Sequence, residues 1–126
     1  MRSRRTRQLE TIENVLRNAG RPLAIAELHA AASESLSGVG IATIYRAVKE
    51  LGDAGSIVCV TYAGQPARFE WAVARHHSHF ICHTCKRVFD FDAPEEVPLP
   101  KRRPQGFKFT GDEVVYYGYC ADCRPK

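Results

Sequence analysis

Three segments in the first half of the chain carry apolar residues at helical spacing. Over Leu9–Ala19 these residues recur at i, i+3 and i+4, and Gly20 follows, which predicts an amphipathic helix. The segments Ala24–Ser33 and Ile41–Gly55 show the same period. A Ser-Leu-Ser-Gly stretch separates these two segments and predicts a turn. We therefore expect three helices, the last two joined by a flexible turn.

The rest of the chain has the residue types of β-strands. Residues 57–62 and 67–71 are β-branched, aromatic or apolar runs separated by Ala-Gly-Gln-Pro, so they predict a β-hairpin. The segment 93–106 contains four prolines, which leave any helix there short or broken. Later runs of the same kind predict four more strands: His79–Cys82, Arg87–Phe91, Phe107–Phe109 and Glu113–Tyr119.

These elements predict an α+β fold in two domains. Three helices followed by a hairpin are the elements of a winged helix, here over residues 1–72. Residues 73–126 predict a small α/β domain whose sheet edges invite pairing with a second copy of the chain, so we expect a homodimer. A chain of 126 residues buries only a small core, so a bound metal or a partner subunit is expected to stabilise it.

The basic residues are concentrated near the N-terminus. The net charge is +4, from 18 basic and 14 acidic residues, which suggests a polyanionic partner. The sequence predicts a short N-terminal arm that contacts DNA phosphates or enters a minor groove. A frayed, solvated terminus is the alternative. Four arginines precede the first acidic residue, Glu10: Arg2, Arg4, Arg5 and Arg7.

The third expected helix carries residue types that contact DNA. A helix fits the major groove of double-stranded DNA, where such side chains bond to base edges and phosphates. The order of helices and hairpin favours this interpretation over an ordinary solvated surface helix. The candidate DNA-contacting residues on its non-apolar faces are Thr43, Tyr45, Arg46 and Lys49.

Cysteine usage indicates a metal site rather than disulfides. No apolar run approaches the roughly 20 residues that span a bilayer, and the N-terminus has no apolar export segment, so we expect a cytoplasmic protein without membrane contact. In that compartment the five cysteines stay reduced. Two C-x-x-C pairs can provide four thiolates to one tetrahedral structural Zn²⁺: Cys82 with Cys85, and Cys120 with Cys123. Two unrelated reduced thiol turns, or an iron–sulfur cluster, are the alternatives.

The same pairs do not indicate an enzyme. A thiol oxidoreductase would place one pair at a helix N-terminus in a βαβ unit, which is not predicted here. A zinc hydrolase would need an open coordination position and a base, as in H-E-x-x-H, and the sequence has no such motif. We expect no small organic substrate. A zinc-binding adaptor that does not bind DNA is the remaining alternative.

A second group of metal-ligand types precedes the first pair. Three histidines, His76, His77 and His79, lie between Glu70 and Asp90. In an extended segment His77 and His79 would lie on one face and His76 on the other. Imidazole and carboxylate ligands without thiolate suit Fe²⁺, Mn²⁺ or Zn²⁺. A polar linker with solvated histidines is the alternative.

Several motifs together resemble those of the ferric uptake regulator (Fur) family, over nearly the whole chain. The combination is far more specific than any single part. The motifs are Thr6 with Gln8, the run Gly40–Arg46, Gly55, Arg68-Phe-Glu70, the run His76–Cys82, and Tyr117-Gly-Tyr-Cys120.

The resemblance implies a dimeric regulator, in most cases a repressor, of metal-homeostasis or oxidative-stress genes. It implies structural zinc on the four paired cysteines, and DNA contacts by Tyr45 and Arg46. It also implies a sensory Fe²⁺, Zn²⁺ or Mn²⁺ at the hinge between the domains. Carried over by position, the sensory ligands are Glu70, His77, His79 and Asp90.

Two departures concern the metal sites. Many iron and peroxide sensors of the family complete the sensory site with a histidine of the DNA-binding domain, where this chain has Pro22. His29 or Cys59 is a candidate replacement, with a surface histidine and a buried thiol as the alternatives. A third family site would use His76, but Ser78 stands in place of its acidic partner. The sensed metal, the operator and the third site stay open.

Overall fold

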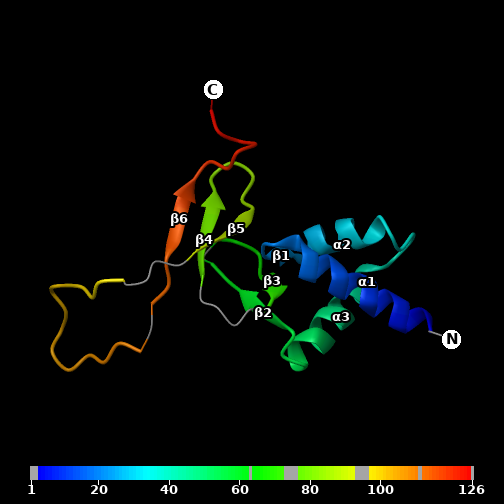
Figure 1. Cartoon of the computed structure of the whole chain (residues 1–126), viewed down its shortest axis with the longest axis horizontal. Helices are drawn as coiled ribbons and strands as arrows, with labels where there is room; N and C mark the ends of the chain where they lie inside the picture. The colour runs from blue at the N-terminus through cyan, green and yellow to red at the C-terminus, as the bar shows by residue number, and fades with distance from the viewer. Residues whose placement is uncertain (1–2, 63, 73–76, 93–96, 111, 126) are drawn as a thin grey trace.

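Three helices and a three-stranded sheet form the first part of the chain (Figure 1). The computed structural model describes residues 3–62, 64–72, 77–92, 97–110 and 112–125, without the side chain of His77. The helices are α1 (Arg4–Ala19), α2 (Ile25–Ser33) and α3 (Ile41–Asp53). The antiparallel sheet has the order β1-β3-β2, from β1 (Leu23–Ala24), β2 (Ile57–Val60) and β3 (Arg68–Trp71). The expected helices and hairpin are confirmed.

Helix α1 begins earlier than the apolar pattern predicts. The Ser3 side chain accepts a hydrogen bond of 3.1 Å from the Thr6 amide and thereby caps the first turn. The helix ends at Gly20, whose φ of 68° lies in the left-handed region. The expected N-terminal arm is therefore wrong for the described residues, because capping extends the helix over the basic segment. The arginines in its first turns are Arg4, Arg5 and Arg7.

The core of this part lies between the three helices and the sheet. Trp71 and Phe69 of β3 pack against it, and Arg17 of α1 lies 4.5 Å from the Trp71 ring. The buried residues follow the period that predicted the helices. They include Ile12, Leu16, Leu28, Ala32, Ile44, Val48, Leu51 and Ile57.

The second sheet has the order β5-β4-β6, with β4 antiparallel to β5 and parallel to β6. Its strands are β4 (His77–Cys82), β5 (Val88–Asp92) and β6 (Val115–Gly118). The predicted strand over Phe107–Phe109 is wrong. These residues lie in the segment between β5 and β6, which runs outward from the sheet (Figure 1), and Phe107 is 65% exposed. The aromatic pattern there has no neighbouring strand to pair with in the described part.

The α+β class is confirmed, while the predicted division into two domains stays a prediction. The first sheet ends at Trp71 and the second begins at His77, so the predicted boundary after residue 72 stays a prediction that lies next to undescribed residues. Within the described ranges, no helix combines the length and apolar character that a membrane span requires.

Candidate metal centres and nucleic-acid interface

Four cysteine sulfurs converge at one end of the second sheet. Cys82 ends β4, Cys85 follows in the turn, and Cys120 and Cys123 lie beyond β6, which pairs with β4. All four sulfurs lie within 4.8 Å of one another, and those of Cys85 and Cys120 are 3.9 Å apart. Zn–S bonds of ~2.3 Å at tetrahedral angles separate sulfurs by ~3.8 Å. The spacing therefore fits one tetrahedral zinc ion.

Hydrogen bonds favour the thiolate state that zinc requires at Cys82 and Cys85, whereas hydrogen bonding with Cys120 raises the pKa of Cys123 to about 12. The Cys120 amide donates to Cys82 Sγ at 3.5 Å and is the largest cause that lowers the pKa of Cys82 to about 5. Burial raises the pKa of Cys85, but hydrogen bonds from the Arg87 side chain, whose Nε lies 3.1 Å away, from the Arg87 backbone and from Cys120 together lower it further than burial raises it. Arg87 also pairs with Asp122 at 3.1 Å. The donors favour negative sulfur at this position.

A second cluster lies where the two sheets meet. Glu70 belongs to β3, His79 to β4 and Asp90 to β5. His79 Nε2 lies 3.3 Å from Glu70 Oε1 and 3.1 Å from Asp90 Oδ1. Metal–ligand bonds of ~2.1 Å at octahedral to tetrahedral angles place ligand atoms roughly 3.0–3.4 Å apart. His79 Nε2 is therefore spaced from each carboxylate as two ligands of one divalent cation would be, and all three ligand atoms lie within 4.8 Å of one another.

Without a cation, the same geometry retains a proton on His79. Hydrogen bonding to Asp90 and then to Glu70 raises the pKa of His79 to about 9, although burial opposes this shift. His79 and Glu70 are 7% and 5% exposed, so water screens their interaction little. The proton on His79 Nε2 then lies next to the two carboxylates, in the place that a cation bound by these three residues would take.

The second ring nitrogen of His79 faces a residue that sequence patterns do not indicate. Tyr62 Oη lies 2.6 Å from His79 Nδ1, and the two rings meet edge to face. Tyr62 follows β2 in the hairpin, far from His79 in sequence. Its aromatic ring helped to predict a strand, but no local motif links it to a histidine of the other sheet.

The structure brings together three of the four predicted sensory ligands. His77 begins β4 and is paired with Asp92 in the register, but its side chain lies outside the described part, as does His76. Ser78 is buried. The predicted role of His77 and the third family site remain untested.

The two candidate replacements for the missing histidine lie elsewhere. His29 Nε2 contacts the Val39 carbonyl at 2.8 Å, between α2 and the start of α3. Cys59 is exposed on β2, opposite Phe69. Neither belongs to the described cluster of Glu70, His79 and Asp90. Pro22 is buried.

Arg68 connects the first part of the chain to the cysteine turn. It is 4% exposed, pairs with Glu27 of α2, and donates from Nη2 to the Lys86 carbonyl at 2.7 Å. Glu27 also pairs with Arg21 at 2.9 Å. Lys86 directly follows Cys85 and has a left-handed φ of 64°. One buried guanidinium therefore contacts both the helical part and the cysteine turn.

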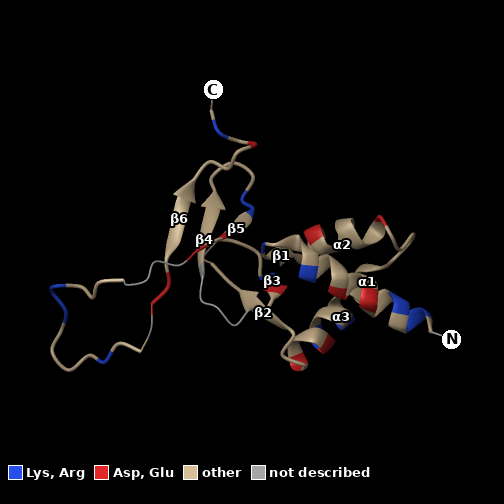
Figure 2. Cartoon of the chain, in the orientation of Figure 1, with Lys and Arg blue, Asp and Glu red and all other residues tan. Residues whose placement is uncertain are grey.

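Helix α3 presents the candidate DNA-contacting residues away from the core. Tyr45 is 57% exposed, and Arg46 and Lys49 are exposed as well, whereas Thr43 is half-buried and accepts from Arg46 Nη2 at 3.1 Å. Figure 2 shows further basic residues in the first turns of α1. Arg5 of α1 lies 3.7 Å from Glu50 of α3, so the basic start of α1 lies beside α3.

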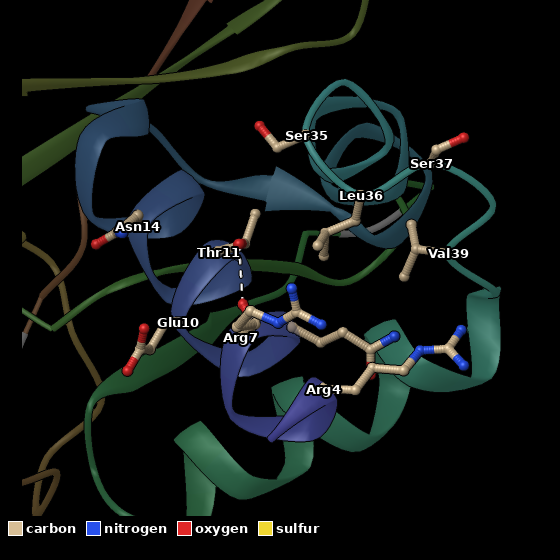
Figure 3. A pocket seen from close by; sticks show the side chains of 10 residues that line it. Arg4, Arg7, Glu10, Thr11, Asn14, Ser35, Leu36, Ser37 and Val39 are labelled. Carbon is tan, nitrogen blue, oxygen red and sulfur yellow. Dashed lines mark hydrogen bonds between the residues drawn. The ribbon is translucent and has the colours of Figure 1, made fainter. Parts of the chain in front are cut away.

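A separate open hollow of about 510 Å³ lies between α1 and the turn after α2 (Figure 3). Thr11 Oγ1 donates to the Arg7 carbonyl at 2.9 Å there. Its lining is largely polar, and none of the lining residues belongs to either metal cluster. They are Arg4, Arg7, Gln8, Glu10, Thr11, Asn14, Ser35, Leu36, Ser37 and Val39.

Comparison with known proteins identifies the relatives of this chain. A model of the ferric uptake regulator family matches residues 1–117. The chain belongs to this family. It is 34% identical over 88 residues to the ferric uptake regulation protein of Campylobacter jejuni, covering 68% of this chain and 56% of that protein. To the Escherichia coli K12 protein it is 33% identical over 90 residues, covering 68% and 61%. The chain therefore matches about three fifths of the length of these relatives.

Solved structures show the same fold. A zinc-bound manganese uptake regulator matches with a TM-score of 0.73 at 24% identity, covering 95% of this chain and 91% of that one. The Helicobacter pylori ferric uptake regulator, described with three functional metal binding sites, matches with a TM-score of 0.69 at 20% identity, covering 100% and 83%. The Campylobacter jejuni peroxide stress regulator gives a TM-score of 0.61 at 16% identity, covering 94% and 90%. The predicted family and fold class are confirmed.

Proposed function

We propose that this chain is a metal-dependent transcriptional repressor that binds an operator in double-stranded DNA as a homodimer. A divalent cation, Fe²⁺, Zn²⁺ or Mn²⁺, would be its signal. The observation that carries the proposal is the meeting of Glu70 from the first sheet with His79 and Asp90 from the second. The relatives' names, which include ferric uptake, manganese uptake and peroxide stress regulators, support the same class.

The four cysteines would hold a structural zinc ion. Bound zinc supplies a tetrahedral tie between two distant stretches of chain, and its binding energy becomes folding energy. The Cys82 and Cys85 turn joins β4 to β5, while Cys120 and Cys123 follow β6. The cysteines would therefore fix both neighbours of β4 and make the second sheet a rigid support for the sensory ligands.

The sensory residues would couple cation binding to domain position. Glu70 moves with the hairpin, whereas His79 and Asp90 belong to the second sheet. All three contact one cation only when the sheets meet, so that arrangement binds the cation more tightly. Coupling of this kind amounts to about 1–3 kcal/mol, which corresponds to roughly 5- to 150-fold in DNA affinity.

In the dimer, two α3 helices would enter the operator. The exposed Tyr45, Arg46 and Lys49 would contact base edges and phosphates, while Arg4 and Arg5 at the start of α1 would add phosphate contacts. A cation would hold the two helices at the spacing of successive major grooves.

Exposed aromatic residues on the second sheet support the proposed homodimer. Tyr117 is 63% exposed and Phe91 is 52% exposed, on β6 and β5. These are the outer strands of the described sheet, so their outward backbone groups are available for pairing. Apolar surface next to open strand edges is typical of a subunit interface.

The decisive experiment measures DNA binding by the zinc-retaining chain with and without each cation. Fluorescence anisotropy with a selected duplex, in the presence of Mn²⁺, Fe²⁺ or Zn²⁺, should show at least fivefold tighter binding with the regulatory ion. Glu70→Gln should abolish this gain, whereas Glu34→Gln, at an exposed position at the end of α2, should retain it. Duplex binding that is unchanged by every ion would refute the proposal.

The salt dependence of binding separates a DNA regulator from a zinc-binding adaptor. The logarithm of the DNA-binding constant falls linearly with the logarithm of the salt concentration. Each phosphate contact makes this slope more negative by about 0.9. A slope near zero, or no duplex binding with any cation, would favour the adaptor.

A further inference from the structure

Tyr62 is the point at which the hairpin contacts a candidate ligand of the second sheet through a side-chain hydroxyl. It follows β2, which ends at Val60, and belongs to the segment between the two hairpin strands. Its Oη lies 2.6 Å from His79 Nδ1, and the ring centroids are 5.8 Å apart at 69°. Tyr62 is half-buried, so packing as well as the hydrogen bond sets its position.

The two nitrogens of His79 have different partners. Nε2 faces the carboxylates of Glu70 and Asp90, and Nδ1 faces the Tyr62 hydroxyl. A neutral imidazole that binds a cation through Nε2 must carry its remaining proton on Nδ1. That proton needs an acceptor, and the Tyr62 oxygen is in place to accept it. Because Tyr62 lies on the side of the ring away from the carboxylates, it supports the ligand rather than acting as one.

The Tyr62 hydroxyl is both a donor and an acceptor, so its oxygen can accept the Nδ1 proton of His79 while its own proton points elsewhere. This contact joins the hairpin to β4.

We propose that Tyr62 is a positioning residue of the sensory site, which holds His79 in the ring orientation and tautomer that present Nε2 to a cation. The inference rests on the proposed regulatory site and deepens it, because Tyr62 belongs to the hairpin of the first part. Outer partners of metal-bound histidines typically change metal affinity by about 10- to 100-fold. Tyr62 would therefore set the cation concentration at which the protein responds.

The test compares Tyr62→Phe with Tyr116→Phe in the full, zinc-retaining chain. Tyr62→Phe keeps the ring and removes only the hydroxyl, while Tyr116→Phe removes the same atom from a 47% exposed ring on β6. Mn²⁺ is titrated while electron paramagnetic resonance measures the free ion. We expect Tyr62→Phe to weaken Mn²⁺ binding about 10- to 100-fold and Tyr116→Phe to leave it within about twofold.

A spectroscopic measurement separates positioning from a general structural effect. Nitrogen-15 histidine spectra with Zn²⁺ at the sensory site should show His79 bound through Nε2 with a slowly exchanging proton on Nδ1. In Tyr62→Phe that proton should exchange rapidly. Weaker binding with an unchanged His79 spectrum would overturn the positioning role.

The remaining outcomes distinguish this inference from the function on which it rests. If the wild-type chain binds Mn²⁺ and Tyr62→Phe binds it equally well, the inference fails and the regulatory site stands. If both tyrosine variants lose affinity to the same extent, the effect is not specific to Tyr62 and the inference also fails. If the wild-type chain takes up no ion beyond its zinc, the proposed sensory site fails, and the role of Tyr62 fails with it.

Discussion

Protons should compete with the sensory cation at His79. Asp90 and Glu70 raise the pKa of this imidazole to about 9 from 6.5, so the cation-free protein carries a proton there at neutral pH. A cation that binds through Nε2 must displace it. Raising the pH is therefore the perturbation of choice, because it removes the competing proton without altering any ligand.

The expected change in Mn²⁺ affinity with pH follows from the raised and the ordinary pKa of His79. While His79 is protonated in the free protein, releasing one proton per ion raises the apparent affinity tenfold per pH unit. Between pH 6.5 and pH 8.5 the affinity for Mn²⁺ should thus rise about 75-fold, slightly less than two decades because part of His79 is already neutral at pH 8.5. An imidazole with the ordinary pKa of 6.5 would give only about twofold over the same range, since half of it is already neutral at the start.

Isothermal titration calorimetry of the zinc-retaining protein provides the assay. Mn²⁺ is titrated at several pH values in pairs of buffers with different ionisation enthalpies, which gives both the affinity and the number of protons released. Close to one proton per ion should be released from His79 at pH 7.5. An affinity that changes less than about threefold from pH 6.5 to 8.5, with no proton release, would refute the assignment of His79 as a protonated ligand.

Four further predictions test the remaining contacts. In the absence of the sensory ion, the raised pKa of His79 should stabilise the fold by about 3 kcal/mol below pH 6.5, and this stability should be lost as the pH rises through 9 in urea titrations. Cys120→Ser should lower the zinc content and the melting temperature, measured by elemental analysis and circular dichroism, whereas Cys59→Ser should change neither. Arg68→Ala should cost about 2 kcal/mol in urea, because it removes the side-chain donor of the Lys86 carbonyl and one of the partners of Glu27, which keeps Arg21, while Lys49→Ala, in an exposed pair, should cost under about 1 kcal/mol. Arg46→Ala should weaken duplex binding and reduce its salt slope by about 0.9.

The local elements could be predicted because their signals are local. The helical period of the core residues and the paired cysteines each depend on spacing within a few residues. Helix α1 still begins earlier than the apolar pattern, because Ser3 caps it and capping acts outside the apolar stripe. The strand predicted over Phe107–Phe109 is wrong because strand residues need a neighbouring strand, and aromatic spacing contains no information about one.

The contacts between the two parts of the chain could be predicted only in part. Glu70, His79 and Asp90 follow from position in the family, but their spacing depends on the register of three strands in two sheets. Tyr62 and Arg68 join segments distant in sequence, through one hydroxyl and one guanidinium. Strand β1 is only two residues long and pairs with β3. A pattern this short is not distinguishable from a loop.

The position of Pro22 leaves the coupling between the two parts to other residues. Many family members supply a sensory histidine there, from the side of the DNA-binding helices. In this chain that side contributes Glu70 and, through His79, Tyr62. Arg68 holds the hairpin to the turn after Cys85 with or without a sensory cation, since neither of its partners belongs to the sensory cluster. Under the proposed function, the cation would have to shift an equilibrium that Arg68 already biases toward the arrangement in which the two sheets meet, so a cluster with fewer ligands would suffice. Arg68→Ala should therefore increase the dependence of DNA binding on the cation. Tyr62→Phe should instead raise the cation concentration that DNA binding requires.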